Sequence, residues 1–146
     1  RQASDFTNVL PQPGFADYSR ALTCWDASTT SWQLNLDWTA GFPQDLISAS
    51  AAPLPTGSQF ALWVTNPHNP TGQLWSQDSL KKLLPQFGLV VVDEAFLPLV
   101  PGGEAQSLIP LLAEHPNLVV VRSLTKLFAV AGLRLGYALA SINSSA

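Results

Sequence analysis

A single lysine in an apolar setting is the residue with the most chemical potential in this sequence. Lys126 follows the hydroxyl residues Ser123 and Thr125 and precedes the apolar segment 127–131. We expect this segment to be buried, which would disfavour the charged ammonium, lower the pKa of the lysine and leave a nucleophilic amine. The two hydroxyls, together with Arg134 eight positions further on, are groups that bind phosphate. An amine that can form an imine beside a phosphate site is what pyridoxal phosphate requires.

Two further polar residues follow apolar stretches. Asp93 ends a run of four apolar residues, where an unpaired carboxylate would be costly. The N–H of a protonated pyridine ring would compensate that carboxylate; capping of the next segment is the alternative role. Asn69 lies in the segment Asn-Pro-His-Asn-Pro-Thr-Gly at 66–72, which is a strong turn signal, so Asn69 could be a turn former, a ligand or both.

Periodicity predicts the elements that would position these residues. Apolar runs and alternation predict strands over 6–10, 32–36, 60–64, 89–92, 118–121 and 135–139. Helical spacing and capping signals predict helices over 15–25, 44–50, 76–86 and 107–114. The alternation of strands and helices predicts an α/β fold, a three-layer α-β-α arrangement with a mostly parallel sheet.

The predicted strand ends explain how distant residues could form one site. In parallel α/β sheets, ligands lie outside the carboxyl ends of the strands. The segments 66–69 and 123–126 each follow a predicted strand, and Asp93 closes another. We therefore expect these polar groups to gather at one edge of the sheet.

The bulk composition indicates one globular domain. The chain has 146 residues, of which 47% are hydrophobic and 12% are charged, enough for a substantial core. A net charge of −3 without a lysine or arginine cluster argues against a nucleic-acid surface. Cys24 is the single cysteine, which excludes an internal disulfide and a cysteine-based metal site. With no apolar run of membrane-spanning length and no recognisable signal peptide, we expect a cytoplasmic protein that binds neither nucleic acid nor membrane.

Three segments together resemble a known family. In their order, 66–72, 90–96 and 123–136 are similar to the class I/II aminotransferases, the fold-type I pyridoxal-phosphate enzymes. The resemblance covers about 6–140 and is greatest to the branch of histidinol-phosphate aminotransferase and threonine-phosphate decarboxylase. It implies that 1–146 is part of the large, cofactor-binding domain, without the N-terminal segment that carries the glycine-rich phosphate loop and without the C-terminal small domain. We expect such a part to be inactive alone, and the whole protein to be a homodimer acting on a small amino acid or amino-alcohol phosphate.

The resemblance also implies a role for each candidate residue. Lys126 corresponds to the Schiff-base lysine, which also transfers protons, and Asp93 to the partner of the pyridine nitrogen. Asn69 corresponds to the residue that donates to the phenolic oxygen of the cofactor. The residues assigned to phosphate binding are Ser123, Thr125 and Arg134.

The segment 13–18 is similar to the family motif Pro-Thr-Tyr-x-x-Tyr, whose first aromatic residue stacks on the cofactor ring. Phe15 would take that role, since stacking does not need a hydroxyl; a core aromatic residue is the alternative. We expect Tyr18 to contribute packing, His68 to be a loop residue rather than an acid–base group, and Glu94 to be structural.

Phe96 departs from the aminotransferase pattern. Histidinol-phosphate aminotransferases usually have tyrosine at this place, and its hydroxyl donates to the phenolic oxygen, which phenylalanine cannot do. Asp-Glu-Ala-Phe at 93–96 and Arg-Ser-Leu-Thr-Lys at 122–126 look more like the threonine-phosphate decarboxylase of the cobalamin pathway. We therefore rank decarboxylation first and transamination of histidinol phosphate second. A non-catalytic, aminotransferase-like sensor domain remains a third alternative.

Overall fold

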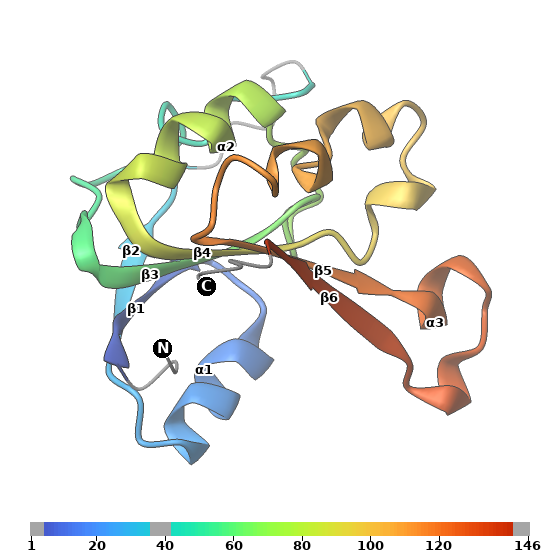
Figure 1. The fold of residues 1–146 in the computed structure, drawn as a ribbon, viewed down its shortest axis with the longest axis horizontal. Coiled ribbons are helices and arrows are strands. Elements are labelled where there is room, and N and C mark those ends of the chain that lie inside the picture. Colours follow the sequence, from blue (N-terminus) through green and yellow to red (C-terminus); the bar gives the residue numbers. More distant parts are fainter. Residues whose placement is uncertain (1–4, 36–41, 142–146) are drawn as a thin grey trace, which may run out of the picture.

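The computed structural model describes residues 5–35 and 42–141. A six-stranded sheet divides the molecule into layers (Figure 1). Helix α1 (Ala16–Cys24) covers one face, and α2 (Gln77–Leu83) covers the other face together with short 3-10 helices. This confirms the predicted three-layer α/β fold. Within the described residues, no helix is both long enough and apolar enough to cross a membrane.

The sheet is parallel except at one edge. Its spatial order is β2-β1-β3-β4-β5-β6. The first five strands pair in parallel, whereas β6 runs antiparallel to β5. The strands are β1 (Thr7–Gln12), β2 (Thr29–Gln33), β3 (Gly57–Thr65), β4 (Phe87–Asp93), β5 (Leu118–Ser123) and β6 (Gly136–Ala140). The carboxyl ends of the five parallel strands consequently meet at one edge.

The main core lies between the sheet and the α2 side. Val90 and Val92 point into it from β4, and Leu80 and Leu83 face them from α2. Helix α2 begins where the sequence predicts, because the Ser76 hydroxyl accepts the Ser79 amide at 3.1 Å. A smaller apolar cluster on the other face holds α1 against the sheet; it contains Leu10, Leu22 and Ala27, with Tyr18 and Trp63 packed beside it.

Two predicted helices are wrong. Residues 46–49 form turns instead of a helix, because the Asp45 carboxylate accepts the amides of Ile47 and Ser48. The segment 107–114 contains only the 3-10 helix Ile109–Leu111 and further turns, and the Leu108 amide donates to Glu94.

The edge strand β2 is shifted from its predicted position. It covers Thr29–Gln33 rather than 32–36, and residue 36 lies outside the described residues. The remaining predicted strands and the helices over 15–25 and 76–86 are confirmed, with shifts at their ends and with 84–86 forming a 3-10 turn.

Candidate functional site

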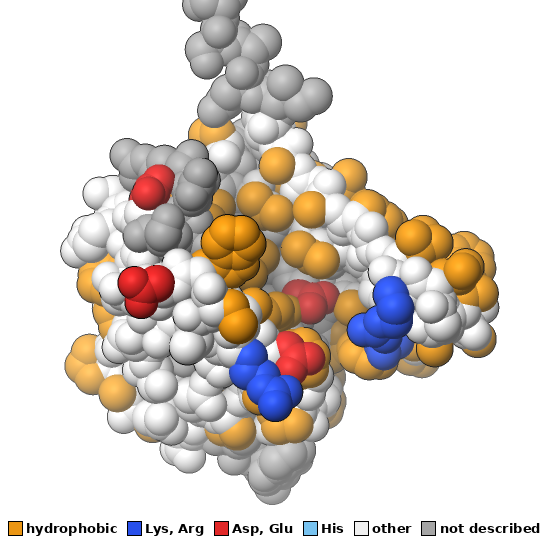
Figure 2. Space-filling model, turned by 90° about the horizontal axis from the view of Figure 1, so that it is seen from below, with side chains coloured by type: hydrophobic (Ala, Val, Ile, Leu, Met, Phe, Trp, Pro, Cys, Tyr) orange, Lys and Arg blue, Asp and Glu red, His pale blue; other side chains and the backbone are white. Residues whose placement is uncertain are grey.

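One cavity at the carboxyl edge of the sheet collects all of the predicted site residues. Its volume is about 320 Å³. The predicted residues that line it are Phe15, Asn69, Asp93, Ser123, Thr125, Lys126 and Arg134. They come from the ends of four strands that are far apart in the sequence. Figure 2 shows a hollowed face between the body and the arm that carries α3 (Leu124–Leu127), with basic side chains on the arm and acidic ones in the hollow.

Asp93 is held by two donors. The Ala95 amide donates to Oδ1 at 2.9 Å, and the Tyr18 hydroxyl donates to Oδ2. Burial, and then the charge of Asp93, raises the pKa of Tyr18 far above its usual range, so the phenol stays protonated and remains a donor. Tyr18 packs in the smaller apolar cluster, as expected, and in addition orients Asp93. The half-buried carboxylate is fixed in direction and still has lone pairs free for a ligand in the cavity.

Lys126 lies in a more open position than its sequence suggests. We expected its apolar neighbours to bury the segment, but Lys126 is exposed, and Leu127 and Phe128 are 45% and 63% exposed. The segment is part of the arm that extends from the body (Figure 1), where no described element covers it. The ammonium lies 5.3 Å from the centre of the Phe96 ring, a cation–π contact that points it toward the cavity wall.

The proposed phosphate groups lie together at the end of β5. The hydroxyls of Ser123 and Thr125 are 2.7 Å apart. Arg134 adopts a left-handed conformation with φ of 49°, which is uncommon for a residue other than glycine and often marks a functional site. No carboxylate among the described residues lies within ion-pair distance of Arg134. The arginine is therefore free to pair with an anion in the cavity.

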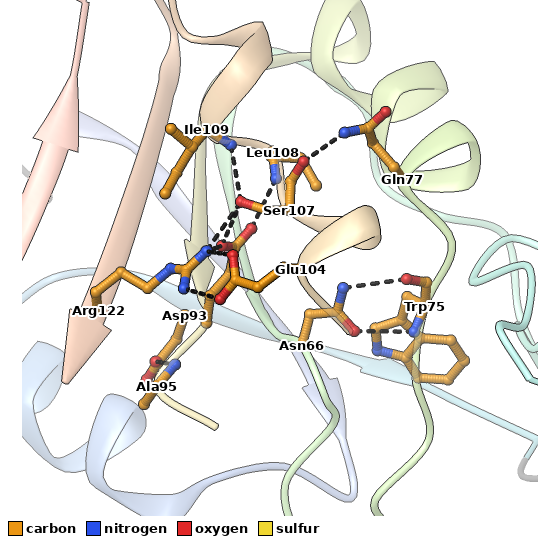
Figure 3. A network of polar contacts seen from close by, with 11 residues as sticks. Asn66, Trp75, Gln77, Asp93, Ala95, Glu104, Ser107, Leu108, Ile109 and Arg122 are labelled. Carbon is orange, nitrogen blue, oxygen red and sulfur yellow. Dashed lines mark hydrogen bonds and ion pairs between the residues drawn. The ribbon is translucent and has the colours of Figure 1, made fainter. Parts of the chain in front are cut away.

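Phe15 and Asn69 reach the cavity from two neighbouring loops. Phe15 is 40% exposed and makes an edge-to-face contact with Tyr18, with ring centres 5.4 Å apart. Asn69 is half-buried, and its backbone amide donates to the Thr65 hydroxyl at 2.9 Å. Its loop is closed by Asn66, whose side chain bonds both the amide and the carbonyl of Trp75 (Figure 3). Asn66 thus holds the turn closed.

A buried ion pair lies beneath the cavity. Arg122 donates to Glu94 at 2.7 Å, and the two side chains are 7% and 0% exposed. Glu94 also accepts from the Leu108 amide and the Ser107 hydroxyl, both at 2.8 Å, while Arg122 pairs with Glu104 at 2.7 Å. Burial raises the pKa of Glu94, and these donors oppose the rise. The network joins the ends of β4 and β5 next to Asp93 and Ser123.

Sequence reasoning missed Tyr18, Arg122 and His68 as parts of this site. Tyr18 lies three residues after Phe15 on the first turns of α1, a spacing that puts both on one side of the helix and could have indicated it. Arg122 directly precedes the phosphate segment, but nothing in the sequence identifies Glu94 as its partner. His68 lies in a loop, as expected, but its side chain is buried, at 4% exposure.

Residues 7–144 match the family model described as aminotransferase class I and II. The chain belongs to this family. A histidinol-phosphate aminotransferase of Brevibacillus brevis is 41% identical over 83 residues, which are 55% of this chain and 23% of that protein. The enzyme of the same name from Halorubrum lacusprofundi is 33% identical over 132 residues, 88% of this chain and 34% of that protein. The chain thus spans about a quarter to a third of the length of these relatives.

Solved structures agree with the aminotransferase fold. L-threonine-O-3-phosphate decarboxylase from Porphyromonas gingivalis superposes with a TM-score of 0.70 at 23% identity, over 95% of this chain and 40% of that one. Histidinol-phosphate aminotransferase from Sinorhizobium meliloti, solved with pyridoxal-5'-phosphate, superposes with a TM-score of 0.68 at 22% identity. The superposition covers 94% of this chain and 36% of that one. At these identities the likeness supports the fold. Family membership itself implies pyridoxal phosphate, the cofactor expected from the sequence.

Removing the buried carboxylate of Glu94 should lower the stability of the protein. Glu94→Gln leaves the buried guanidinium of Arg122 without its innermost counter-charge, and we expect the free energy of unfolding to fall by about 3 kcal/mol in urea denaturation. Glu104→Gln is the matched control: its side chain is 57% exposed, so the loss should be at most about 1 kcal/mol. Equal losses in the two variants would contradict the importance of the buried pair.

His68 should make stability depend on pH. Burial lowers its pKa, so the folded protein favours the neutral ring while the unfolded chain binds a proton near pH ~6.5. The contribution is complete above that pH and decreases as the pH falls toward the folded-state pKa. We expect the free energy of unfolding to fall more steeply between about pH 6.5 and 5 in the wild type than in His68→Gln. An unchanged slope in His68→Gln would refute the assignment.

Proposed function

We propose that the chain forms the cofactor-holding part of a pyridoxal-phosphate-dependent enzyme that transaminates a phosphate-bearing amino acid or amino alcohol, of the histidinol-phosphate type. One observation carries the proposal. An amine, a carboxylate, two hydroxyls, a free guanidinium and an aromatic ring, contributed by separate strand ends, all line one cavity. This is the set of groups that the cofactor needs.

The residues present fit the cofactor in charge and in chemistry. Arg134, Ser123 and Thr125 offer a cation and two hydroxyls for a phosphate dianion. Asp93 offers an oriented carboxylate for a ring N–H. The Phe15 ring offers an apolar face. Pyridoxal phosphate, with a phosphate at one end and a ring nitrogen at the other, has a complementary group for each of these residues in one cavity.

Each residue would perform a separate task. When bound, pyridoxal phosphate supplies an aldehyde for covalent attachment and a ring that accepts electron density from the substrate. Lys126 would hold that aldehyde and, when its amine is free, take up and return the proton at the substrate Cα. Asp93 would keep the ring nitrogen protonated, and Asn69 would donate to the phenolic oxygen. Phe15 would exclude water from one face of the ring.

The substrate class is supported by the relatives rather than by the cavity. The relatives described above, at 41% and 33% identity, are named histidinol-phosphate aminotransferases. They favour transamination, which reverses the ranking from the sequence. Phe96 is the observation that favours threonine-phosphate decarboxylation as a second candidate, because it lines the cavity without a hydroxyl to donate. The share of these relatives that the chain spans supports the proposal that it is part of a large domain, with substrate groups contributed from elsewhere.

Lys126 is the lysine that we expect to bond to the cofactor. The whole protein that contains this chain should be incubated with pyridoxal phosphate, reduced with borohydride and mapped by mass spectrometry. We expect the pyridoxyl label on Lys126, because it is the lysine that lines the cavity. A label on Lys81 or Lys82 of α2 instead would overturn the assignment.

The two candidate reactions differ in their products. The whole protein should be given histidinol phosphate with 2-oxoglutarate, and in parallel L-threonine O-3-phosphate. We expect glutamate from the first mixture, at a rate well above CO₂ release from the second. CO₂ release without glutamate formation would favour decarboxylation. A lack of both products, with the cofactor bound, would argue for another substrate or for the sensor domain.

A further inference from the structure

Two loops at the carboxyl ends of neighbouring strands supply Phe15 and Asn69. Strands β1 and β3 are parallel and adjacent in the sheet, so the loops that follow them leave from the same edge. The first loop passes through Pro13 before α1 begins, and the second runs through 66–72. How these two loops sit against each other therefore sets the position of Phe15 relative to Asn69.

His68 joins the two loops. Its ring is buried, at 4% exposure, and packs against Trp75 with ring centres 5.5 Å apart. Its Nε2 lies 2.7 Å from the carbonyl oxygen of Pro13 in the first loop. Its Nδ1 lies 3.3 Å from the Thr65 hydroxyl, which in turn accepts the backbone amide of Asn69 at 2.9 Å.

The chemistry of the partners determines which atom donates in each of these hydrogen bonds. A carbonyl oxygen can only accept, so Nε2 of His68 carries the proton and donates to Pro13. The neutral ring then has a free lone pair on Nδ1, which accepts the Thr65 hydroxyl proton. Because that hydroxyl donates to His68, its oxygen is available to accept the backbone amide of Asn69. Both ring nitrogens of His68 and the Thr65 hydroxyl thus have partners, and the contact between His68 and Pro13 spans 55 residues of chain.

We propose that His68 is a positioning residue for the cofactor site, and that its two hydrogen bonds hold the Phe15 loop and the Asn69 loop at a fixed spacing. The proposal rests on the proposed function, because it takes Phe15 and Asn69 as cofactor-binding residues. Thr65, Asn69 and Phe15 line the site cavity among the described residues, whereas His68 does not. His68 therefore acts through these residues, and not by contact with the cofactor or the substrate.

Two other roles for a buried histidine are less consistent with this geometry. A general base needs a ring nitrogen that can reach a reacting proton, but both nitrogens of His68 already have partners inside the loops. A residue that only fills space would need no polar partner on either loop. A packing role would also predict that substitutions change overall stability without changing how the cofactor is held.

Three substitutions separate the two hydrogen bonds. His68→Phe keeps a ring and removes both bonds. In His68→Gln, the side-chain amide can reach the place of Nε2 and keep the bond to Pro13, while the bond to Thr65 is lost. In His68→Asn, the shorter amide can replace Nδ1 and keep the bond to Thr65, while Pro13 loses its donor. His115→Phe is the matched control, since His115 is half-buried and precedes β5 at the opposite edge of the sheet.

The first readout needs no cofactor. In the whole protein without pyridoxal phosphate, amide hydrogen exchange followed by mass spectrometry should show faster exchange across 66–72 and around Pro13 in His68→Phe. His68→Asn should show the larger change around Pro13, and His68→Gln the larger change across 66–72. His115→Phe should leave both loops unchanged. Unchanged exchange of both loops in His68→Phe would overturn the proposal.

The second readout is the bound cofactor. We expect His68→Phe to raise the Kd for pyridoxal phosphate roughly tenfold. The pH midpoint of the visible absorption should shift upward, as in Asn69→Ala, because a donor to the phenolic oxygen is displaced. A lowered melting temperature with unchanged Kd and pH midpoint would show that His68 only packs, and would overturn the proposal.

If His68→Phe does not fold, the Gln and Asn variants decide by the same criteria. A wild-type protein that binds no pyridoxal phosphate would instead contradict the proposed function, and hydrogen exchange would still decide whether His68 joins the loops.

Discussion

The ion pair between Glu94 and Arg122 is the constraint on which the site depends. A charge buried to this degree is tolerated only when it is paired and hydrogen-bonded, and here each partner meets the other and further polar groups. The pair fixes the ends of β4 and β5 relative to each other. Asp93 precedes the buried carboxylate by one residue, and Ser123 follows the buried guanidinium by one residue. Fixing the pair therefore fixes the Asp93 carboxylate and the start of the phosphate segment relative to each other, at the ends of two neighbouring strands.

Other parts of the site are held in place by individual hydrogen bonds. Tyr18 connects α1 to Asp93 and also supports the Phe15 ring. His68 connects the loop after β3 to the loop before α1. Each of these hydrogen bonds connects two elements that the sheet brings close together but does not orient relative to each other. The parallel sheet thus provides proximity, and the buried polar contacts provide orientation, which is what preorganised binding of a rigid cofactor requires.

The sequence predicts the strand ends and their polar residues because both signals are local. Runs such as 89–92 are long enough to identify buried strands, and Asp93 or Ser123 follows directly. Pairings between distant segments are not visible in this way. An aromatic residue on one face of α1 is as consistent with packing as with a hydrogen bond. The contact of Tyr18 with Asp93 is therefore visible only in the structure. The burial expected around Lys126 fails for a related reason: its neighbours are apolar, but the arm extends from the body, and apolarity alone does not show which element would cover them.

The central claim is that one cavity holds pyridoxal phosphate through residues from four strand ends. A crystal structure of the whole protein with the cofactor tests this most directly. The account predicts density continuous with the Lys126 side chain, the phosphate against Ser123, Thr125 and Arg134, and the ring nitrogen facing Asp93. A cofactor bound elsewhere, or bound in this cavity with its phosphate away from Arg134 and its ring nitrogen away from Asp93, would contradict the account.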